Sequence, residues 1–287
     1  MERIKLAIEK TKAAEAGSVR PDVRLLHKFS DSETSAGEPD ATPRNEAALG
    51  DLGSVEYVHT AVVSMDPAHL DRHRIISHQK IHPACWAFDV LRTQVLQKMD
   101  ENGWRTLAIT SPNVESGKTV VAINLAMSIA QQTNRTALLV DFDLRRPSVA
   151  RYLGLKRSLS LNDFLDGRVK NIGETFVNPG IERCVVLPTN QAVTNASEVL
   201  SSAKVGHLIS DLRERYSDRI VIFDLPPVLA ADDVMTVLPR IDCVLMVMGS
   251  GVSTENEVEE AMGRLSKANL LGVVLNKDEA PVQNAYY

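Results

Sequence analysis

From residue 106 onward, the sequence alternates between short apolar runs and longer stretches with helical spacing. Six runs of four to seven residues recur, each followed by a turn: LAIT, ALLVDF, CVVLP, IVIFDLP, CVLMVM and LLGVVLN. Because these runs lack polar alternation, they predict parallel strands buried on both faces, and the stretches between them are long enough for crossover helices. The pattern predicts an α/β fold with a doubly wound, mostly parallel sheet flanked by helices.

The N-terminal third has a different pattern. Apolar residues around Ile4 and Ile8 suggest an amphipathic helix, whereas residues 30–50 are polar, contain Pro and Gly, and predict a flexible linker. The run VEYVHTAVV could be a strand, and the helical pieces after it end near Asn102. We divide the chain into a partly disordered N-terminal extension (1–55), a helical lead-in (56–104), the main domain (105–277) and a C-terminal tail (278–287).

Composition limits the classes of partner. The chain of 287 residues has a net charge of -5 and a pI near 5.8, which argues against a nucleic-acid-binding surface. Cys85, Cys184 and Cys243 are scattered and odd in number, so a reducing cytoplasm is expected rather than a disulfide framework. No apolar stretch approaches the roughly 20 residues of a membrane span, so any membrane association is expected to be peripheral.

A loop between the first apolar run and a helical stretch carries candidate phosphate-binding residues. ESGKT, residues 115–119, follows LAIT and precedes VVAINLAMSIAQQ. In this order of strand, loop and helix, backbone N–H groups and the helix N-terminus face a phosphate. Lys118 can then reach the β and γ phosphates, and the Thr119 hydroxyl can reach Mg²⁺. On this segment alone, an ordinary helix start stays open as the alternative.

Acidic residues end two other apolar runs. Asp141 and Asp143, with Arg145, follow ALLV, and Asp224 ends IVIF about a hundred residues after the loop. The carboxyl ends of parallel strands form the crevice in which α/β sheets bind ligands. Asp143 could instead simply cap the next helix. Together, one lysine, one hydroxyl and three carboxylates predict a site for phosphates and Mg²⁺, an ion that prefers oxygen ligands.

The segments ESGKT, LLVDFDLRRP and VIFDLPP resemble, in this order, the Walker A, Walker A′ and Walker B motifs of the bacterial tyrosine kinases (BY-kinases) of capsule and exopolysaccharide synthesis. That family is related to the MinD/ParA branch of P-loop NTPases. The likeness extends from residue 106 to the end of the chain. MinD and ParA proteins have a signature lysine early in the loop; no lysine precedes Lys118 there, which favours the kinase branch.

The resemblance implies transfer of the γ-phosphoryl group of ATP to tyrosine, with ATP and Mg²⁺ as cofactors. Asp141 is the candidate carboxylate that polarises the incoming phenol, and whether Arg145 contacts phosphates or pairs with an acid stays open. The implied residues are, for nucleotide binding, Ser116, Gly117, Lys118, Thr119, Val120, Arg145 and Asn276; for Mg²⁺, Thr119, Asp143 and Asp224; and for catalysis, Lys118, Asp141, Asp143 and Asp224.

The chain ends in NAYY, and the family's C-terminal tyrosines are phosphorylated, so Tyr286 and Tyr287 are the predicted phosphoacceptors. The ten residues between Asn276 and Tyr286 span about 33 Å when extended, enough to reach their own site or that of a neighbour. The resemblance also implies a membrane-bound polysaccharide copolymerase as partner, a cytoplasmic location at the inner face of the membrane, and control of polymer length or export.

The sequence departs from the family in its loop, in its ring-assembly motif and in its short tyrosine cluster. Val114 and Glu115 replace the Pro and Gly of the loop, which predicts weaker nucleotide binding unless Glu115 points to solvent. The family's ring-assembly motif is matched at Arg92 alone, with Trp86 and Asp89 at its other positions, so a family-type homo-oligomer is in doubt. Two rival functions therefore stay open, a MinD/ParA-like ATPase switch and a catalytically silent interaction module.

Four histidines precede the main domain and invite a metal interpretation: His69, His73, His78 and His82. Their spacing matches no recognised zinc pattern, so a solvated helix surface is the preferred interpretation.

Overall fold

The computed structural model describes residues 24–26, 60–79, 82, 84–131, 135–156 and 159–278. The predicted first helix, the linker over residues 30–50 and the two terminal tyrosines lie outside this part of the chain.

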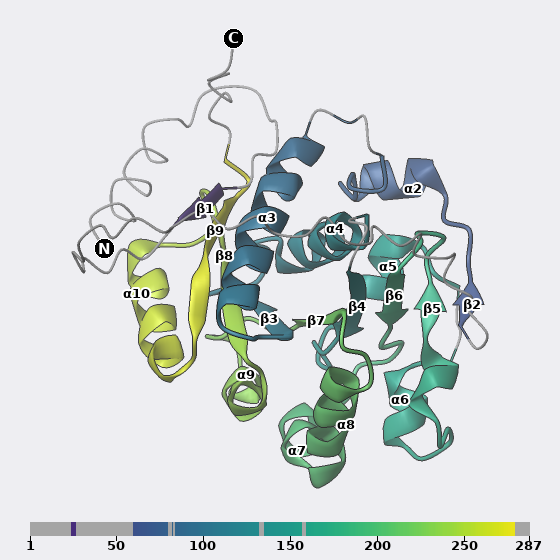
Figure 1. The fold of residues 1–287 in the computed structure, drawn as a ribbon. Coiled ribbons are helices and arrows are strands. Elements are labelled where there is room, and N and C mark those ends of the chain that lie inside the picture. The colour runs from purple at the N-terminus through teal and green to yellow at the C-terminus, as the bar shows by residue number, and fades with distance from the viewer. Residues whose placement is uncertain are drawn as a thin grey trace, which may run out of the picture.

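The described strands form one nine-stranded sheet in the order β1-β9-β8-β3-β7-β4-β6-β5-β2 (Figure 1). The six central strands, from β9 to β6, are parallel, whereas β1 is antiparallel to β9 and β5 is antiparallel to β6. These six strands are the six predicted apolar runs, which confirms the predicted α/β fold. The strands are β1 (Arg24–Leu26), β2 (Ala61–Val62), β3 (Thr106–Thr110), β4 (Thr136–Asp141), β5 (Val177–Asn178), β6 (Cys184–Leu187), β7 (Arg219–Asp224), β8 (Cys243–Gly249) and β9 (Leu270–Asn276).

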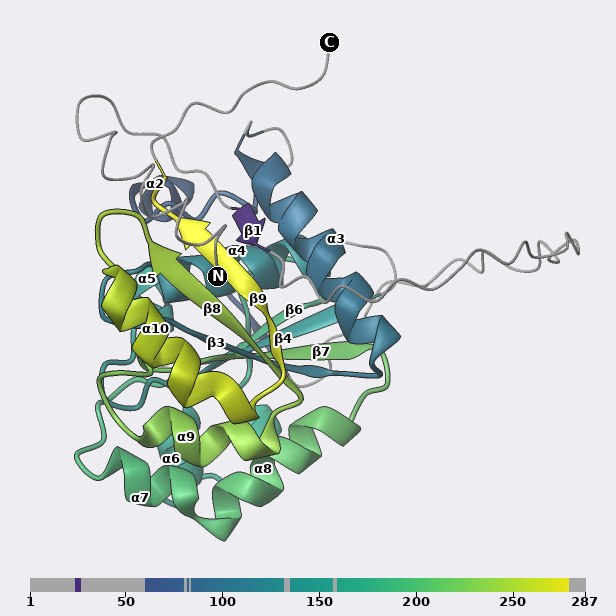
Figure 2. The same ribbon diagram turned by 90° about the vertical axis from the view of Figure 1, so that its left-hand side faces the viewer.

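Helices cover both faces of the sheet, as Figure 2 shows with α3 on one side and α7, α8 and α9 on the other. Alternate strand residues face the two layers, so that Leu107 and Ile109 pack with α3 and α4 while Ala108 packs with α8 and α10. The helices are α2 (Pro67–Arg72), α3 (Cys85–Glu101), α4 (Lys118–Ala130), α5 (Val149–Leu153), α6 (Leu161–Leu165), α7 (Ala196–Ser201), α8 (Ala203–Glu214), α9 (Asp233–Val237) and α10 (Glu255–Arg264), with the short 3₁₀ helices η1 (Ile172–Thr175), η2 (Leu238–Arg240) and η3 (Leu265–Lys267).

Helix α4 lies deep in the molecule. Twelve of its 13 residues are buried, because it packs against the sheet on one side and α3 on the other. Its sequence is accordingly apolar on almost every face, as expected for a helix within a core. The packing of α4 therefore fixes its N-terminus near the carboxyl end of the central strand β3.

The lead-in segment packs on the same core as the main domain. Leu70, Leu91 and Met99 belong to the hydrophobic cluster that contains α4. The suggested strand in VEYVHTAVV is present as the two residues of β2. Strand β1 lies within the predicted N-terminal extension, where the sequence predicted no strand. None of the helices in the described ranges is long and apolar enough to span a membrane.

Candidate functional site

The predicted loop and acids meet at the carboxyl ends of three neighbouring strands. Strand β7 lies between β3 and β4, and its register places Asp224 directly opposite Asp141 and beside Ile109. The loop that follows β3 ends at the N-terminus of α4. The parallel topology thus brings together side chains that are up to 106 residues apart in sequence.

The loop enters α4 through Gly117, which adopts a left-handed conformation with φ 87°. A Cβ atom at this position would lie 2.1 Å from the side-chain nitrogen of Asn276. The Asn276 Nδ2 donates a 2.9 Å hydrogen bond to the Ser116 carbonyl, so the end of β9 supports the loop. Both the backbone angle and the close approach therefore require glycine at residue 117.

Lys118 lies among the acids. Its Nζ is 2.9 Å from Asp143 Oδ2 and 3.3 Å from Asp224 Oδ1, and the Thr119 hydroxyl donates a 2.6 Å hydrogen bond to the other Asp224 oxygen. Burial alone would lower the pKa of Lys118, but the negative charges of Asp224 and Asp143 outweigh it and raise the pKa. The lysine is thus a permanent cation at the point where the carboxylates converge.

Asp141 is fully buried behind this cluster. Its Oδ2 accepts hydrogen bonds of 2.9 Å from the backbone N–H groups of Ser148 and Val149, whereas its buried Oδ1 has no hydrogen-bond partner among the described residues. Burial and the adjacent Asp224 raise the pKa of Asp141 well above its usual value, and burial also raises that of Asp224. A carboxylate in this environment binds a proton readily.

Arg145 pairs with an acid that the sequence did not identify. Its Nε lies 2.6 Å from Asp233 Oδ2 and its Nη2 3.1 Å from Asp233 Oδ1. Burial raises the pKa of Asp233, but the Arg145 and Ser197 hydrogen bonds outweigh this and lower it. Arg145 lines the pocket, and its ion pair with Asp233 on α9 fixes the position of its guanidinium group. The predicted contact of Arg145 with phosphates stays a prediction.

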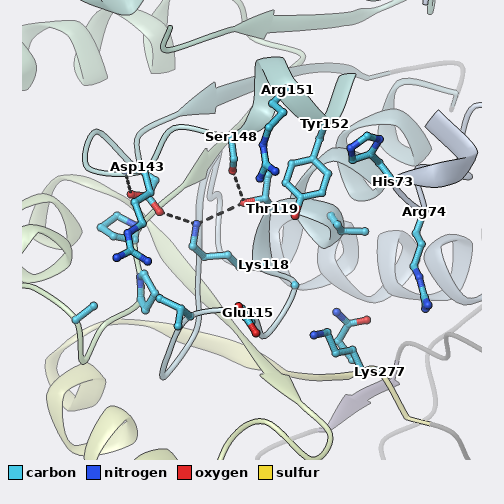
Figure 3. Close-up of a pocket in the computed structure, with 18 of the residues that line it drawn as sticks. His73, Arg74, Glu115, Lys118, Thr119, Asp143, Ser148, Arg151, Tyr152 and Lys277 are labelled. Atoms are coloured by element: carbon cyan, nitrogen blue, oxygen red, sulfur yellow. Dashed lines mark hydrogen bonds and ion pairs between the residues drawn. The ribbon is translucent and has the colours of Figure 1, made fainter. Parts of the chain in front are cut away.

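Part of this cluster lines a pocket of about 910 Å³, whereas Asp141, Asp224 and Asp233 are buried behind its wall (Figure 3). Lys118, Thr119 and Asp143 are on its wall, and Val120, Asn276 and Arg145 also contribute. Oxygen atoms of Thr119, Asp143 and Asp224 surround the Lys118 ammonium group. Hydroxyl and carboxylate oxygens are also the ligands that Mg²⁺ prefers. The donor set therefore fits the predicted Mg²⁺.

Comparisons with known proteins identify the family. A family model described as an AAA domain (AAA_31) matches residues 105–256. The chain is 26% identical over 202 residues to "Putative tyrosine-protein kinase CapB" of Staphylococcus aureus, covering 70% of this chain and 87% of CapB. It is 32% identical over 188 residues to tyrosine-protein kinase wzc of Salmonella typhi, covering 65% of this chain and 26% of that protein. The solved structure of the kinase domain of Escherichia coli tyrosine kinase ETK matches with a TM-score of 0.67 and 28% identity, covering 79% of this chain and 91% of that domain. The chain belongs to the bacterial tyrosine kinases.

Family membership confirms the resemblance inferred from the three motifs and gives the altered loop its significance. Glu115, where BY-kinases carry glycine, has φ 64° and so keeps a backbone conformation that favours glycine. Its side chain is exposed at the edge of the pocket, as is that of Val114. The charge of Glu115 is thus near the loop but open to solvent, the condition under which the sequence predicted a smaller loss of nucleotide affinity.

Two of the three positions compared with the family's ring-assembly motif, Arg92 and Asp89, make contacts within one molecule. Arg92 lies 2.6 Å from Asp89 within α3 and donates to the Ser128 hydroxyl on α4. Trp86 is 61% exposed. Arg92 therefore ties two helices of one molecule together, and the doubt about a family-type ring stays a prediction.

Three of the four histidines contact backbone groups, and the ring centres of His69 and His73 lie 4.2 Å apart. His69 Nε2 lies 2.9 Å from the Arg151 carbonyl, His73 Nδ1 lies 2.9 Å from the His69 carbonyl, and His82 accepts from the Ala84 N–H. Within the described ranges, no group of three or more His, Cys, Asp or Glu side chains is arranged to hold a metal. The predicted Mg²⁺ ligands are two carboxylates and one hydroxyl, so an ion bound there would depend on phosphates and water for its remaining ligands.

Two site residues escaped the sequence analysis. Asp233 fixes Arg145, and Asn124 on α4 binds the segment before α3 with its side-chain amide. Asp233 follows none of the six runs predicted as strands, so its sequence context did not mark it. Asn124 carries a usable signal, because a polar amide within an apolar helix predicts a buried hydrogen-bonding role.

Proposed function

We propose that this protein is an ATP-dependent protein-tyrosine autokinase that transfers the γ-phosphoryl group of Mg-ATP to tyrosine, with Tyr286 and Tyr287 as acceptors. The observation that carries the proposal is the position of Lys118, Thr119 and Asp143 on the wall of a pocket, with the buried Asp224 in contact with Lys118 and Thr119 behind that wall. The named activity of the relatives supports it.

The loop residues have distinct roles in this proposal. The backbone N–H groups from Ser116 to Val120 bind phosphates at the helix N-terminus, and Lys118 leaves Asp143 to contact the β and γ phosphates. Asn276, next to Gly117, contacts the nucleotide from the end of β9. Thr119, Asp143 and Asp224 would hold Mg²⁺, which when bound would supply positive charge to neutralise the phosphates during transfer.

Asp141 receives the proton in the proposed reaction. The tyrosine oxygen forms a bond to the γ phosphorus, the bond from that phosphorus to the β–γ bridging oxygen breaks, and ADP leaves with the electron pair. The phenol, whose pKa is near 10, loses its proton to a nearby carboxylate. The unpartnered Oδ1 and the raised pKa of Asp141 support this role.

The cellular role is proposed from the family. We expect a cytoplasmic kinase that associates with the inner face of the membrane through a polysaccharide copolymerase and regulates capsule or exopolysaccharide polymerisation and export. Self-association in some form is part of the proposal, since an acceptor tail can enter the site of a neighbour.

The test is to incubate purified protein with Mg-ATP, with and without the cytoplasmic fragment of the copolymerase, and to probe for phosphotyrosine. Loss of signal in Lys118→Met and in the Tyr286→Phe/Tyr287→Phe variant supports the kinase. Tyr216→Phe is the matched control, because Tyr216 is exposed and outside the pocket lining, and it should keep the signal. ATP hydrolysis without phosphotyrosine identifies the ATPase switch, and the absence of nucleotide binding identifies a silent relative.

A further inference from the structure

The pocket is much more basic than the protein that contains it. Its lining includes seven Lys or Arg residues and two acidic residues, whereas the whole chain has a net charge of -5. Lys118 and Arg145 are paired with acids. Mg-ATP is only doubly negative, so several cations of the lining have no counterpart in the nucleotide.

Three of these cations form one side of the pocket, here called the basic rim: Arg72, Arg74 and Arg151. Arg72 ends α2, Arg74 follows two residues later, and Arg151 is on α5. Helices α2 and α5 are neighbours, joined by the 2.9 Å contact of His69 Nε2 with the Arg151 carbonyl. Figure 3 shows Arg151 and Arg74 on the side of the pocket away from Asp143.

The rim is rigidly attached to the nucleotide loop. Arg74 has φ 58°, and its carbonyl accepts a 3.0 Å hydrogen bond from the buried Asn124 amide. The Asn124 Oδ1 in turn accepts from the backbone N–H groups of Ile76 and Ser77 at 2.8 and 2.9 Å. Since Asn124 is on α4, the helix that begins at Lys118, the loop and the rim are parts of one framework.

The rim charges are exposed and available. Within the part of the chain that the structure describes, no ion pair involves Arg72, Arg74 or Arg151. Between them lies Tyr152, whose ring meets His73 edge-on at 5.4 Å and has the Arg151 guanidinium 4.9 Å from its centre. A ring surface surrounded by guanidinium groups suits a ligand that carries both an aromatic ring and carboxylates.

We propose that the basic rim selects acceptor polypeptides other than the chain's own tail, and that the preferred acceptor of this kind is a tyrosine flanked by acidic residues. This inference rests on the proposed kinase function, because it names the substrate class of the same site. Guanidinium groups bind carboxylates with charge-assisted, often bidentate hydrogen bonds. The rim residues line the same pocket as Thr119. A peptide chain can enter such a hollow, whereas the flat surface of an anionic membrane cannot.

The test measures binding and transfer separately. Binding of a fluorescent random copolymer of Glu and Tyr is titrated against the full chain saturated with Mg-ADP, and phosphorylation of the same copolymer is then measured with Mg-ATP. The rim variant is Arg72→Gln/Arg74→Gln/Arg151→Gln. The matched control, Arg168→Gln/Lys170→Gln/Lys267→Gln, also removes three exposed cations, all outside the pocket lining.

The expected result is copolymer binding weakened about tenfold in the rim variant at low salt, with less than a twofold change in the control and in Mg-ADP affinity. Added salt should weaken the wild type more than the rim variant. Equal copolymer binding by wild type and rim variant overturns the inference. The inference is also overturned if the rim variant loses Mg-ADP affinity while its copolymer binding is unchanged. Binding to phosphatidylglycerol vesicles is measured in parallel, and a variant that loses only this binding overturns the inference as well.

The failure of the inference is distinguishable from failure of the proposed function. If the copolymer binds through the rim but no phosphotyrosine forms, the kinase proposal fails while the rim remains a site for acidic tyrosine-containing peptides. If phosphotyrosine forms with a KM that the rim variant does not change, the kinase proposal stands and the inference fails.

Discussion

Glu115 is a residue at which the backbone and the charge of the loop can be tested independently. It has φ 64°, a conformation that costs a non-glycine residue about 1 kcal/mol, and it brings a negative charge to a loop that binds phosphates. Glu115→Gln removes the charge and keeps the strained conformation. Glu115→Gly removes both.

The two effects have different magnitudes. For unit charges roughly 8 Å apart in a water-like medium, the repulsion is about 0.5 kcal/mol, or about 1 kcal/mol against doubly negative Mg-ATP before screening. Because Glu115 is exposed, we expect nucleotide affinity to increase about threefold in the Gln variant at low ionic strength. Relief of strain by glycine is offset by about 0.5–1 kcal/mol of backbone entropy in the unfolded chain, so the free energy of unfolding should change by less than about 1 kcal/mol.

The assay is titration of a fluorescent, non-hydrolysable ATP analogue with Mg²⁺ at low and physiological salt, paired with urea unfolding of each variant. The gain in affinity should be present in both variants and should shrink as salt is added. A Gln variant that binds no more tightly at low salt would refute the electrostatic part of the reasoning. A Gly variant more than about 2 kcal/mol less stable would refute the backbone part, since glycine is the residue that φ 64° favours.

Three further substitutions follow from the site. Gly117→Ala places a Cβ 2.1 Å from Asn276 Nδ2, and with φ 87° it should destabilise the fold by about 2–3 kcal/mol in urea unfolding, less so in combination with Asn276→Ala. Lys118→Met leaves the buried Asp224 without its cation and should cost about 3 kcal/mol at pH 8. Because burial already raises the Asp224 pKa, this loss should shrink as the pH falls and the carboxyl takes up a proton, measured as unfolding free energy against pH. Asn124→Ala removes the amide that holds the segment before α3 and should cost about 2–3 kcal/mol, with faster proteolysis of that segment.

The sheet was predictable because its strands are buried on both faces. Each central strand is a continuous apolar run, such as CVLMVM in β8, so its position could be read without knowledge of its neighbours. Strand β1 has no such signal. Its pairing with β9 depends on contacts made more than 240 residues later in the chain, which local periodicity does not reveal.

The candidate site was predictable where residues follow strands and unpredictable where they come from elsewhere. Asp141 and Asp224 end neighbouring parallel strands, so their proximity followed from topology. Asp233 begins the short helix α9 and reaches Arg145 from the side. The sequence contains 37 acidic residues, and nothing in it marks Asp233 as the partner of Arg145. That pairing depends on how α9 packs in the folded protein.

The altered loop shows which of its positions is constrained by space. A side chain at residue 117 would enter the volume occupied by Asn276, whereas the side chain at residue 115 leaves the loop toward solvent. Both positions have positive φ, but only residue 117 combines this angle with a close approach of another strand. Glutamate at residue 115 therefore costs a modest conformational energy and a screened charge, while the geometry that directs Lys118 toward Asp143 is kept by Gly117 and the buried helix behind it.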